Sequence, residues 1–181
     1  MHYASLALDS HEKRIPPFGK EALIKPTEVS KFQKQKPLSP DEALQKMERF
    51  CAYRERCPKE VRSKLAEFGL SHADAEQIYK VLQEDKFFNE ERFAMAFAGG
   101  KFRYNYWGRV RIRQELRMRD ISPNLVSKAL DSIDSVEYEV LIQKLLDKKR
   151  QQYADDDHAR EKTAASLIRA GFEMELVFRF L

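Results

Sequence analysis

The sequence KLAEFGL at residues 64–70 returns in altered form as ELRMRDI at residues 115–121 and as SLIRAGF at residues 166–172. The copies are 51 residues apart, and a fixed period of this size is typical of tandem supersecondary units that stack on one another. Each copy has leucine in its second position and an apolar residue in its last. Arrays of this kind bind other macromolecules along an extended surface, which favours a binding protein over an enzyme.

The sixth column of the repeat contains Gly69, Asp120 and Gly171. Each copy has the pattern of a helix end followed by the start of the next helix. The sixth column then corresponds to the position just after the helix, where the backbone takes a positive φ that glycine adopts without penalty. Asp120 breaks the glycine pattern, although aspartate is among the few other residues that tolerate this conformation.

The same register continues into the following helix of each copy. Three apolar positions of this helix are spaced i, i+3 and i+4 in every copy, a spacing that predicts one apolar helical stripe. The aligned columns are Ala75, Val126 and Val177; Ile78, Ala129 and Phe180; and Tyr79, Leu130 and Leu181.

Helix starts are marked by N-cap residues. Ser39 precedes Pro40 and lies three residues before Glu42, which is the pattern of a capping box. Cys57-Pro58 and Ser122-Pro123 repeat the arrangement of cap and proline. Further N-cap candidates are Ser71, Asn89, Asp134 and either Asp156 or Asp157. The patterns together predict nine helices, at residues 40–54, 58–68, 72–85, 90–104, 108–119, 123–132, 135–153, 157–170 and 173–180.

These elements predict an all-α fold of three tandem three-helix repeats, stacked into an elongated curved array. The predicted repeats cover residues 39–87, 88–133 and 134–181, and residues 1–38 are predicted to form an extended or disordered tail. That segment contains four of the seven prolines. Two interpretations of the tail stay open: it orders on a partner, or it is simply solvated.

Composition limits the class of protein further. The chain has 181 residues, of which 43% are hydrophobic and 34% charged, so it can bury a core. It has neither an apolar run long enough to span a membrane nor a signal-peptide core, and we expect a cytoplasmic monomer that does not bind membranes. Cys51, Cys57 and the four histidines show no zinc-binding spacing. We therefore expect no metal and no cofactor, and ordinary helical roles for both cysteines.

Residues 101–119, KFRYNYWGRVRIRQELRMR, form the most basic stretch. Nearly all of its charges are positive. This favours a surface that binds a polyanion or an acidic protein face, because arginine binds phosphate and carboxylate groups well. The other interpretation is a solvated helix face. We expect Trp107 to be a packing anchor and Gly108 to allow close backbone approach or an unusual turn; Tyr104 and Tyr106 stay open between core and contact roles. The candidate partner- or DNA-binding residues are Lys101, Arg103, Arg109, Arg111, Arg113, Arg117 and Arg119.

Three segments resemble the RecX family of bacterial recombination regulators. They are KFFNEERFA at residues 86–94, WGRVRIRQEL at residues 107–116 followed by Ile121, and VRSKL at residues 61–65 followed by Phe68-Gly69. The family typically shows Leu-Asp-Asp-x-Arg-Phe-Ala and later Ile-x-x-Glu-Leu-x-x-Lys-Gly-Ile. This chain departs from the pattern at residues 88–90, which read FNE, and at residues 119–120, which read RD.

The resemblance implies tandem three-helix repeats and a non-catalytic protein that binds the RecA filament on DNA. It further implies that the chain lowers the recombinase, ATPase and coprotease activities of RecA, and that it has a role in DNA repair and the SOS response. Single- or double-stranded DNA is a second candidate partner. A general helical nucleic-acid-binding protein without a recombinase partner is the alternative. An enzyme is disfavoured, because the sequence has no phosphate loop, zinc motif or nucleophile elbow.

Overall fold

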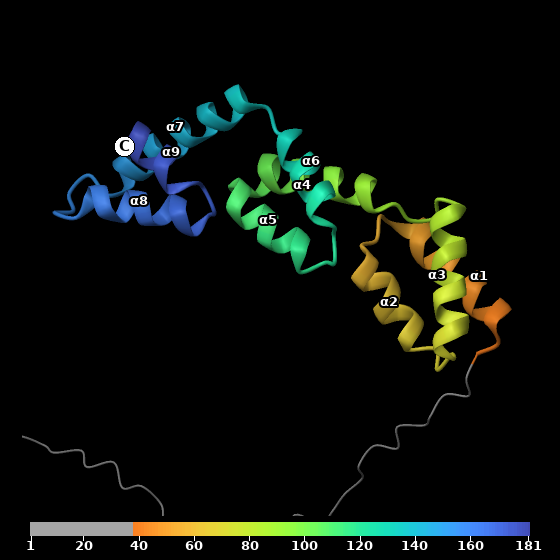
Figure 1. Cartoon of the computed structure of the whole chain (residues 1–181). Coiled ribbons are helices and arrows are strands. Elements are labelled where there is room, and N and C mark those ends of the chain that lie inside the picture. Colours follow the sequence, from red (N-terminus) through yellow and green to blue (C-terminus); the bar gives the residue numbers. More distant parts are fainter. Residues whose placement is uncertain (1–37) are drawn as a thin grey trace, which may run out of the picture. The chain divides into compact units, whose positions relative to one another are not determined.

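The computed structural model describes residues 38–181, and the predicted tail, apart from its last residue, lies outside this part of the chain. Residues 38–181 form nine α-helices and no strand (Figure 1). The helices are α1 (Pro40–Tyr53), α2 (Pro58–Ala66), α3 (His72–Glu84), α4 (Glu90–Asn105), α5 (Arg109–Arg117), α6 (Pro123–Asp131), α7 (Ser135–Gln152), α8 (Ala159–Arg169) and α9 (Met174–Phe180). The all-α prediction is confirmed, and each predicted helix end agrees within two residues.

N-cap side chains accept a hydrogen bond at the start of four of the nine described helices, as the sequence predicts, whereas Ser122 occupies the N-cap position of α6 without such a bond. The Ser39 hydroxyl accepts a hydrogen bond from the Glu42 N–H, and the Glu42 carboxylate accepts one from the Ser39 N–H. Ser71, Asn89 and Asp134 cap α3, α4 and α7 in the same way. Before α2, the Glu60 carboxylate accepts from the N–H of Cys57; this cysteine is therefore a buried cap residue, whereas Cys51 lies within α1.

The predicted N-cap of α8 is wrong, and the helix begins two residues later than predicted. His158, and neither Asp156 nor Asp157, occupies the N-cap position, and its side chain makes no capping hydrogen bond. Asp156 instead accepts a hydrogen bond from the N–H of His158. The carboxylate thus stabilises the turn that precedes the helix, so the helix begins later than the cap pattern predicts.

The sixth column of the sequence repeat takes the predicted backbone conformation in all three copies. The φ angles are 69° at Gly69, 62° at Asp120 and 90° at Gly171. After α5 and α8, the next residue, Ile121 or Phe172, donates its N–H to the carbonyl oxygen five positions earlier. This is the Schellman pattern of helix termination. Aspartate therefore reproduces the glycine turn at the cost of a positive φ.

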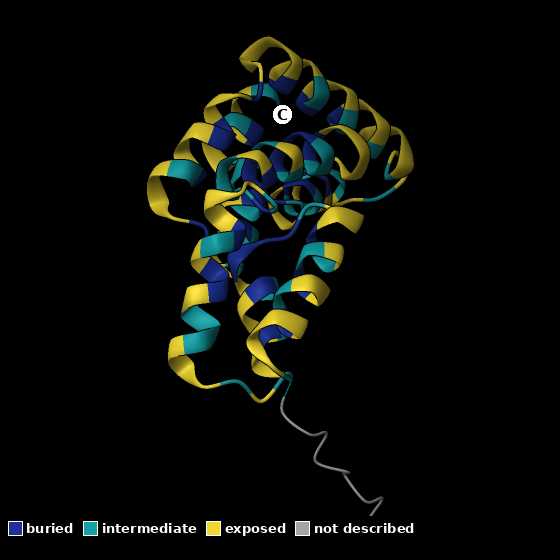
Figure 2. Cartoon of the chain, turned by 90° about the vertical axis from the view of Figure 1, so that its right-hand side faces the viewer, coloured by how far each residue is buried: buried dark blue, intermediate teal, exposed yellow. Residues whose placement is uncertain are grey.

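The nine helices pack as consecutive groups of three. α1 packs against α2 and α3, α4 packs against α5 and α6, and α7 packs against α8 and α9. The leucine column, Leu65, Leu116 and Leu167, is at most 2% exposed and lies on the inner helix faces, as do the other buried positions in Figure 2. The proposed repeat limits, residues 39–87, 88–133 and 134–181, stay a prediction.

Two hydrophobic cores hold the described helices together. The first belongs to α1–α3 and includes Phe88, whose ring packs edge-on against Tyr79 at 5.0 Å between centroids. The second is shared by α4–α9 and also includes Cys57, the N-cap residue of α2. Through its centre the rings of Phe102, Tyr138 and Phe172 follow one another at 5.7 and 5.4 Å. The second and third helix groups therefore share one continuous core.

Candidate partner-binding surface

Helix α5 carries most of the predicted basic residues, and backbone contacts to the turn between α8 and α9 fix its position. The N–H of Gly108 donates to the carbonyl of Ala170 at 2.9 Å, and that of Val110 donates to the carbonyl of Gly171 at 3.0 Å. The start of α5, where N–H groups lack helical partners, thus meets carbonyl groups at the end of α8. The expectation that Gly108 permits close backbone approach is confirmed.

Arg109 is partly buried, and its contacts join α5 to α7 and to the residues before it. Its guanidinium donates to the carbonyl of Ile133 at 3.0 Å and lies 4.1 Å from the centre of the Tyr138 ring. Its backbone N–H donates to the Tyr138 hydroxyl at 2.9 Å, and that hydroxyl donates to the Glu173 carboxylate at 2.6 Å. Arg109, Arg113 and Arg117 are four residues apart on α5, yet they do not form one free face, because Arg109 links α5 to α7.

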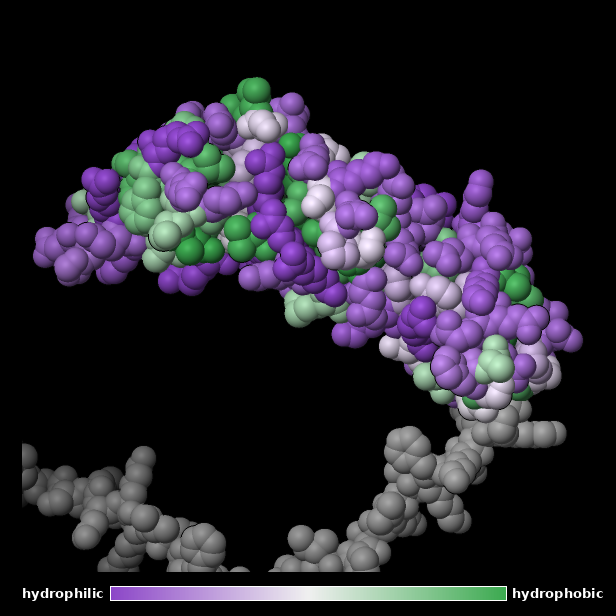
Figure 3. Space-filling model, in the orientation of Figure 1, coloured by the Kyte–Doolittle hydropathy of each residue, from purple (hydrophilic) through white to green (hydrophobic). Residues whose placement is uncertain are grey.

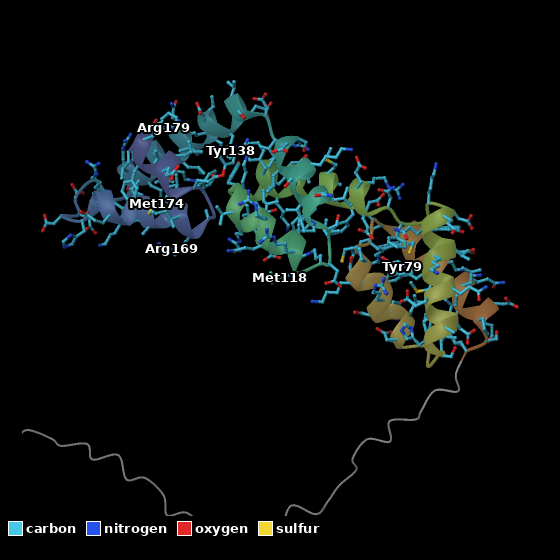
Figure 4. All side chains as sticks on the ribbon, in the orientation of Figure 1. Tyr79, Met118, Tyr138, Arg169, Met174 and Arg179 are labelled. Carbon is cyan, nitrogen blue, oxygen red and sulfur yellow. The ribbon has the colours of Figure 1, made fainter. Side chains whose placement is uncertain are left out.

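The Tyr138 hydroxyl is the centre of this linkage. The side chain of Tyr138 is fully buried, and Figure 4 labels this residue on α7. Burial raises the pKa of the Tyr138 phenol well above its usual range, and the hydrogen bond to Glu173 raises it further. The tyrosine thus stays a neutral donor that joins α5, α7 and the residue before α9.

Three more of the predicted cations lie against aromatic rings. The Lys101 ammonium and the Arg111 guanidinium lie 4.8 and 3.9 Å from the centre of the Trp107 ring. The Arg119 guanidinium lies 4.7 Å from the Phe97 ring and pairs with the Glu115 carboxylate. Trp107 itself packs against the core of α4–α9, so its predicted role as a packing anchor is confirmed. Cations held this way are partly committed to stabilising the fold.

The remaining predicted cations are Arg103, Arg113 and Arg117. All three are exposed, and none forms an ion pair within residues 38–181. The Arg103 guanidinium lies over Gly99 of α4, whereas Arg113 and Arg117 lie one turn apart on α5. Of the seven candidates, these three therefore keep their charge available to a partner. The neighbouring Tyr104 and Tyr106 are also exposed, at 81% and 48%.

Two further exposed cations lie near the ends of α5 and are not among the residues predicted from the sequence. Lys59, at the start of α2, donates to the carbonyl of Met118 at 3.1 Å. Arg169, at the end of α8, is exposed two residues before Gly171, which contacts the start of α5. Neither lies in the basic stretch, and no periodic pattern connects them with it. Only the folded contacts place exposed positive charge near both ends of α5.

The described residues hold no group of three or more histidine, cysteine, aspartate or glutamate side chains that could hold a metal ion. Both cysteines in this part of the chain are buried free thiols, and burial raises the pKa of the Cys51 thiol to about 11. None of the helices from α1 to α9 has both the length and the apolar character needed to cross a membrane. The face in Figure 3 is covered mainly by hydrophilic residues with smaller apolar areas between them.

The part of the chain that carries this surface is similar in sequence to a known protein family. The model of the second three-helix domain of RecX matches residues 89–130, which contain α4, α5 and most of α6. A protein named Regulatory protein RecX from Lactococcus lactis subsp. cremoris is 29% identical over 128 residues, covering 68% of this chain and 48% of the relative. The namesake from Oceanobacillus iheyensis is 25% identical over 130 residues, with 71% and 48% covered. That from Prosthecochloris aestuarii is 25% identical over 135 residues, with 75% and 88% covered.

Solved structures show the same fold. The crystal structure of RecX from Lactobacillus salivarius superposes with a TM-score of 0.73 at 19% identity, covering 78% of this chain and 93% of that one. A second crystal structure, of regulatory protein RecX, gives a TM-score of 0.71 at 21% identity, covering 78% and 70%. The chain spans about half the length of the first two curated relatives and most of the third.

The fold and the matched segment define an all-helical protein built from packed groups of three helices, similar in sequence and fold to RecX proteins. The resemblance to the RecX family seen in the sequence is confirmed by the family model, the curated relatives and the structural neighbours.

Proposed function

We propose that the chain is a non-catalytic, cytoplasmic regulator that binds the RecA filament on DNA and lowers its ATPase, recombinase and coprotease activities. The observation that carries the proposal is the agreement of both sequence and fold with proteins named Regulatory protein RecX. The step to RecA comes from the family resemblance. We expect the chain to act as a monomer, in the context of DNA repair and the SOS response.

The exposed arginines of α5 supply the contact in this proposal. A nucleoprotein filament presents phosphates and acidic protein faces, and both attract guanidinium groups. Arg113 and Arg117 lie on a helix whose start is fixed by Gly171 and whose end is contacted by Lys59. Because the backbone of α5 is held in this way, only the side chains of the two arginines lose conformational freedom on binding, which favours affinity.

The test is the ATPase activity of RecA on single-stranded DNA, titrated with this protein. The intact chain is expected to lower the activity, and the Arg113→Glu/Arg117→Glu variant is expected to require a higher concentration. A matched control is Lys46→Glu/Lys80→Glu, which reverses two exposed charges on α1 and α3 and should behave as the intact chain. No effect of the intact chain on the ATPase would contradict the proposal.

A binding measurement distinguishes the alternative. Regulation of the filament predicts tighter binding to RecA-coated DNA than to bare DNA at physiological salt. Equal and tight binding to bare single- or double-stranded DNA would favour a general nucleic-acid-binding protein. If the two arginines contact phosphates, each lost contact should reduce the slope of log K against log salt by about 0.7–0.9.

A further inference from the structure

A cavity of about 750 Å³ opens between α2 and the neighbouring parts of α4 and α5. Its size falls within the range of roughly 300–1,000 Å³ that is common for ligand pockets. The hydrogen bond from Lys59 to the carbonyl of Met118 joins its two sides, and Figure 4 labels Met118 at the end of α5. Of the seven candidate partner- or DNA-binding residues, Arg119 is the one that lines this cavity.

Apolar side chains form one part of the cavity wall. Phe50 comes from α1, Phe93 and Phe97 come from α4, and Met118 follows α5. Met118 is 55% exposed although it is large and apolar. A methionine side chain adapts its shape to different apolar partners, so this wall can receive an apolar side chain from outside.

Basic side chains form the other part. The lining contains five cations and two carboxylates. Glu60 pairs with both Arg54 and Arg56, and Glu67 pairs with Lys64. Arg119 pairs with Glu115, which lies outside the lining, whereas the Lys59 ammonium reaches only a neutral carbonyl among the described residues. The wall therefore keeps an excess of positive charge. The cations are Arg54, Arg56, Lys59, Lys64 and Arg119, and the carboxylates are Glu60 and Glu67.

The aromatic rings of the cavity already carry cations on their faces. The Arg56 guanidinium lies 3.7 Å from the centre of the Phe50 ring. The Phe97 ring has Arg119 at 4.7 Å and Lys101 at 5.4 Å from its centre. Stacking of nucleic-acid bases needs an open aromatic face, so the arrangement disfavours a single-stranded nucleic acid as the occupant. Apolar contact and carboxylate binding stay available.

We infer that the cavity binds an acidic peptide segment of a partner protein. An aliphatic side chain of the peptide packs against Met118 and the apolar wall, and its carboxylates pair with Lys59 and are attracted by the excess positive charge of the wall. Apolar contact gives the segment its anchor, whereas the charges select an acidic sequence and speed its association. The inference does not depend on the proposed action on RecA, because it concerns α2 and its contact with α4 and α5.

The test uses the full chain and a fluorescein-labelled peptide of sequence Asp-Glu-Asp-Leu-Leu-Asp-Glu-Asp, with fluorescence anisotropy as the readout. The peptide is expected to bind, and more weakly as salt increases. A matched peptide with both leucines replaced by serine should bind at least about fivefold more weakly, since it keeps the charge and loses the anchor. Equal binding of the two peptides would overturn the inference, as would no binding.

Variants of the protein locate the site. Lys59→Glu and Met118→Asp change exposed side chains on opposite sides of the cavity, and each is expected to weaken binding about fivefold or more. Lys80→Glu reverses a charge outside the lining and should leave the affinity unchanged; circular dichroism checks the fold of each variant. Unchanged affinity in both cavity variants would refute the site, and displacement of the peptide by an unlabelled oligothymidine would refute the class of occupant. Neither result involves RecA, so failure here and failure of the proposed function are distinguishable.

Discussion

Gly108 lies directly against Gly171. A Cβ atom placed on Gly108 would come within 2.1 Å of the carbonyl carbon and oxygen of Gly171, and one placed on Gly171 would come within 2.3 Å of the Arg111 Cβ. Neither contact is possible for a real side chain. The start of α5 and the turn after α8 can therefore meet backbone to backbone only because both residues are glycine.

Replacement of Gly108 by alanine should destabilise the protein. The added methyl group meets backbone atoms, which cannot rotate away, so the contact between α5 and the α8–α9 turn must open. We expect a loss of about 1–3 kcal/mol in the free energy of unfolding, the usual cost of overpacking, measured by urea denaturation. The control is Gly100→Ala within α4, where no atom lies within 4 Å of an added Cβ. That change should be neutral or stabilising by up to about 1 kcal/mol, and equal destabilisation of both variants would contradict the argument.

Asp120→Gly should stabilise the protein. Asp120 has a φ of 62°, a conformation that glycine adopts without a Cβ penalty. We expect a gain of about 0.5–1 kcal/mol, reduced somewhat by the greater freedom of glycine in the unfolded chain. Lys86→Gly is a second case, because Lys86, two residues after the end of α3, has a φ of 60°. If neither replacement raised the urea midpoint, strain at these turns would be negligible.

Leu116→Ala should cost about 2–5 kcal/mol of stability, as expected for a fully buried leucine whose removal leaves a cavity. Met118→Ala, two residues later and 55% exposed, should change stability by less than about 1 kcal/mol. The comparison tests whether the leucine column of the repeat is the buried one. Similar losses in the two variants would show that it is not.

Arg109 and Arg113 should separate structural from partner-binding roles. Arg109→Ala removes a hydrogen bond to the Ile133 carbonyl and the contact with the Tyr138 ring, so we expect a loss of about 1–3 kcal/mol in stability. Arg113→Ala changes an exposed side chain without an ion pair in the described structure and should stay within about 0.5 kcal/mol. Thermal unfolding followed by circular dichroism measures both. A larger loss from Arg113→Ala would reverse the assignment.

Stability should fall in alkaline solution. Burial and the neighbouring Glu90 carboxylate raise the pKa of Tyr79 to about 12, and Tyr138 shifts in the same direction. In the unfolded chain a tyrosine loses its proton at about pH 10. The stabilisation is therefore complete below about pH 10 and is lost as the pH rises from there through about 12. Urea unfolding at a series of pH values should show a shallower fall for Tyr79→Phe than for the intact chain; identical slopes would remove Tyr79 as a cause.

The helices were predictable because their signals are local. A cap such as Ser39 forms its hydrogen bond within the first turn of its own helix. The residue type at positions 69, 120 and 171 is restricted by the φ angle of that one residue. Such interactions depend on neighbours in the chain and little on the rest of the fold. The start of α8 was mispredicted where three consecutive aspartates offered competing local hydrogen bonds before His158.

The candidate surface was only partly predictable. Helical spacing groups Arg109 with Arg113 and Arg117, yet the Arg109 side chain lies against the Tyr138 ring and donates to the Ile133 carbonyl. Lys59 reaches the end of α5 from a helix far away in the sequence. Long, flexible cationic side chains have many accessible rotamers, and the partner that selects one is set by packing between elements.

The amino-acid order alone therefore specified nine helices, their turns and a repeated buried column, because hydrogen-bonding caps, φ preferences and apolar periodicity act over a few residues. Folding in three dimensions decided which arginines stay free, which brace the core, and where a cavity opens beside α2. Those outcomes depend on contacts between residues distant in the chain, such as Gly108 with Gly171 and Lys59 with Met118, and no local pattern encodes such a contact.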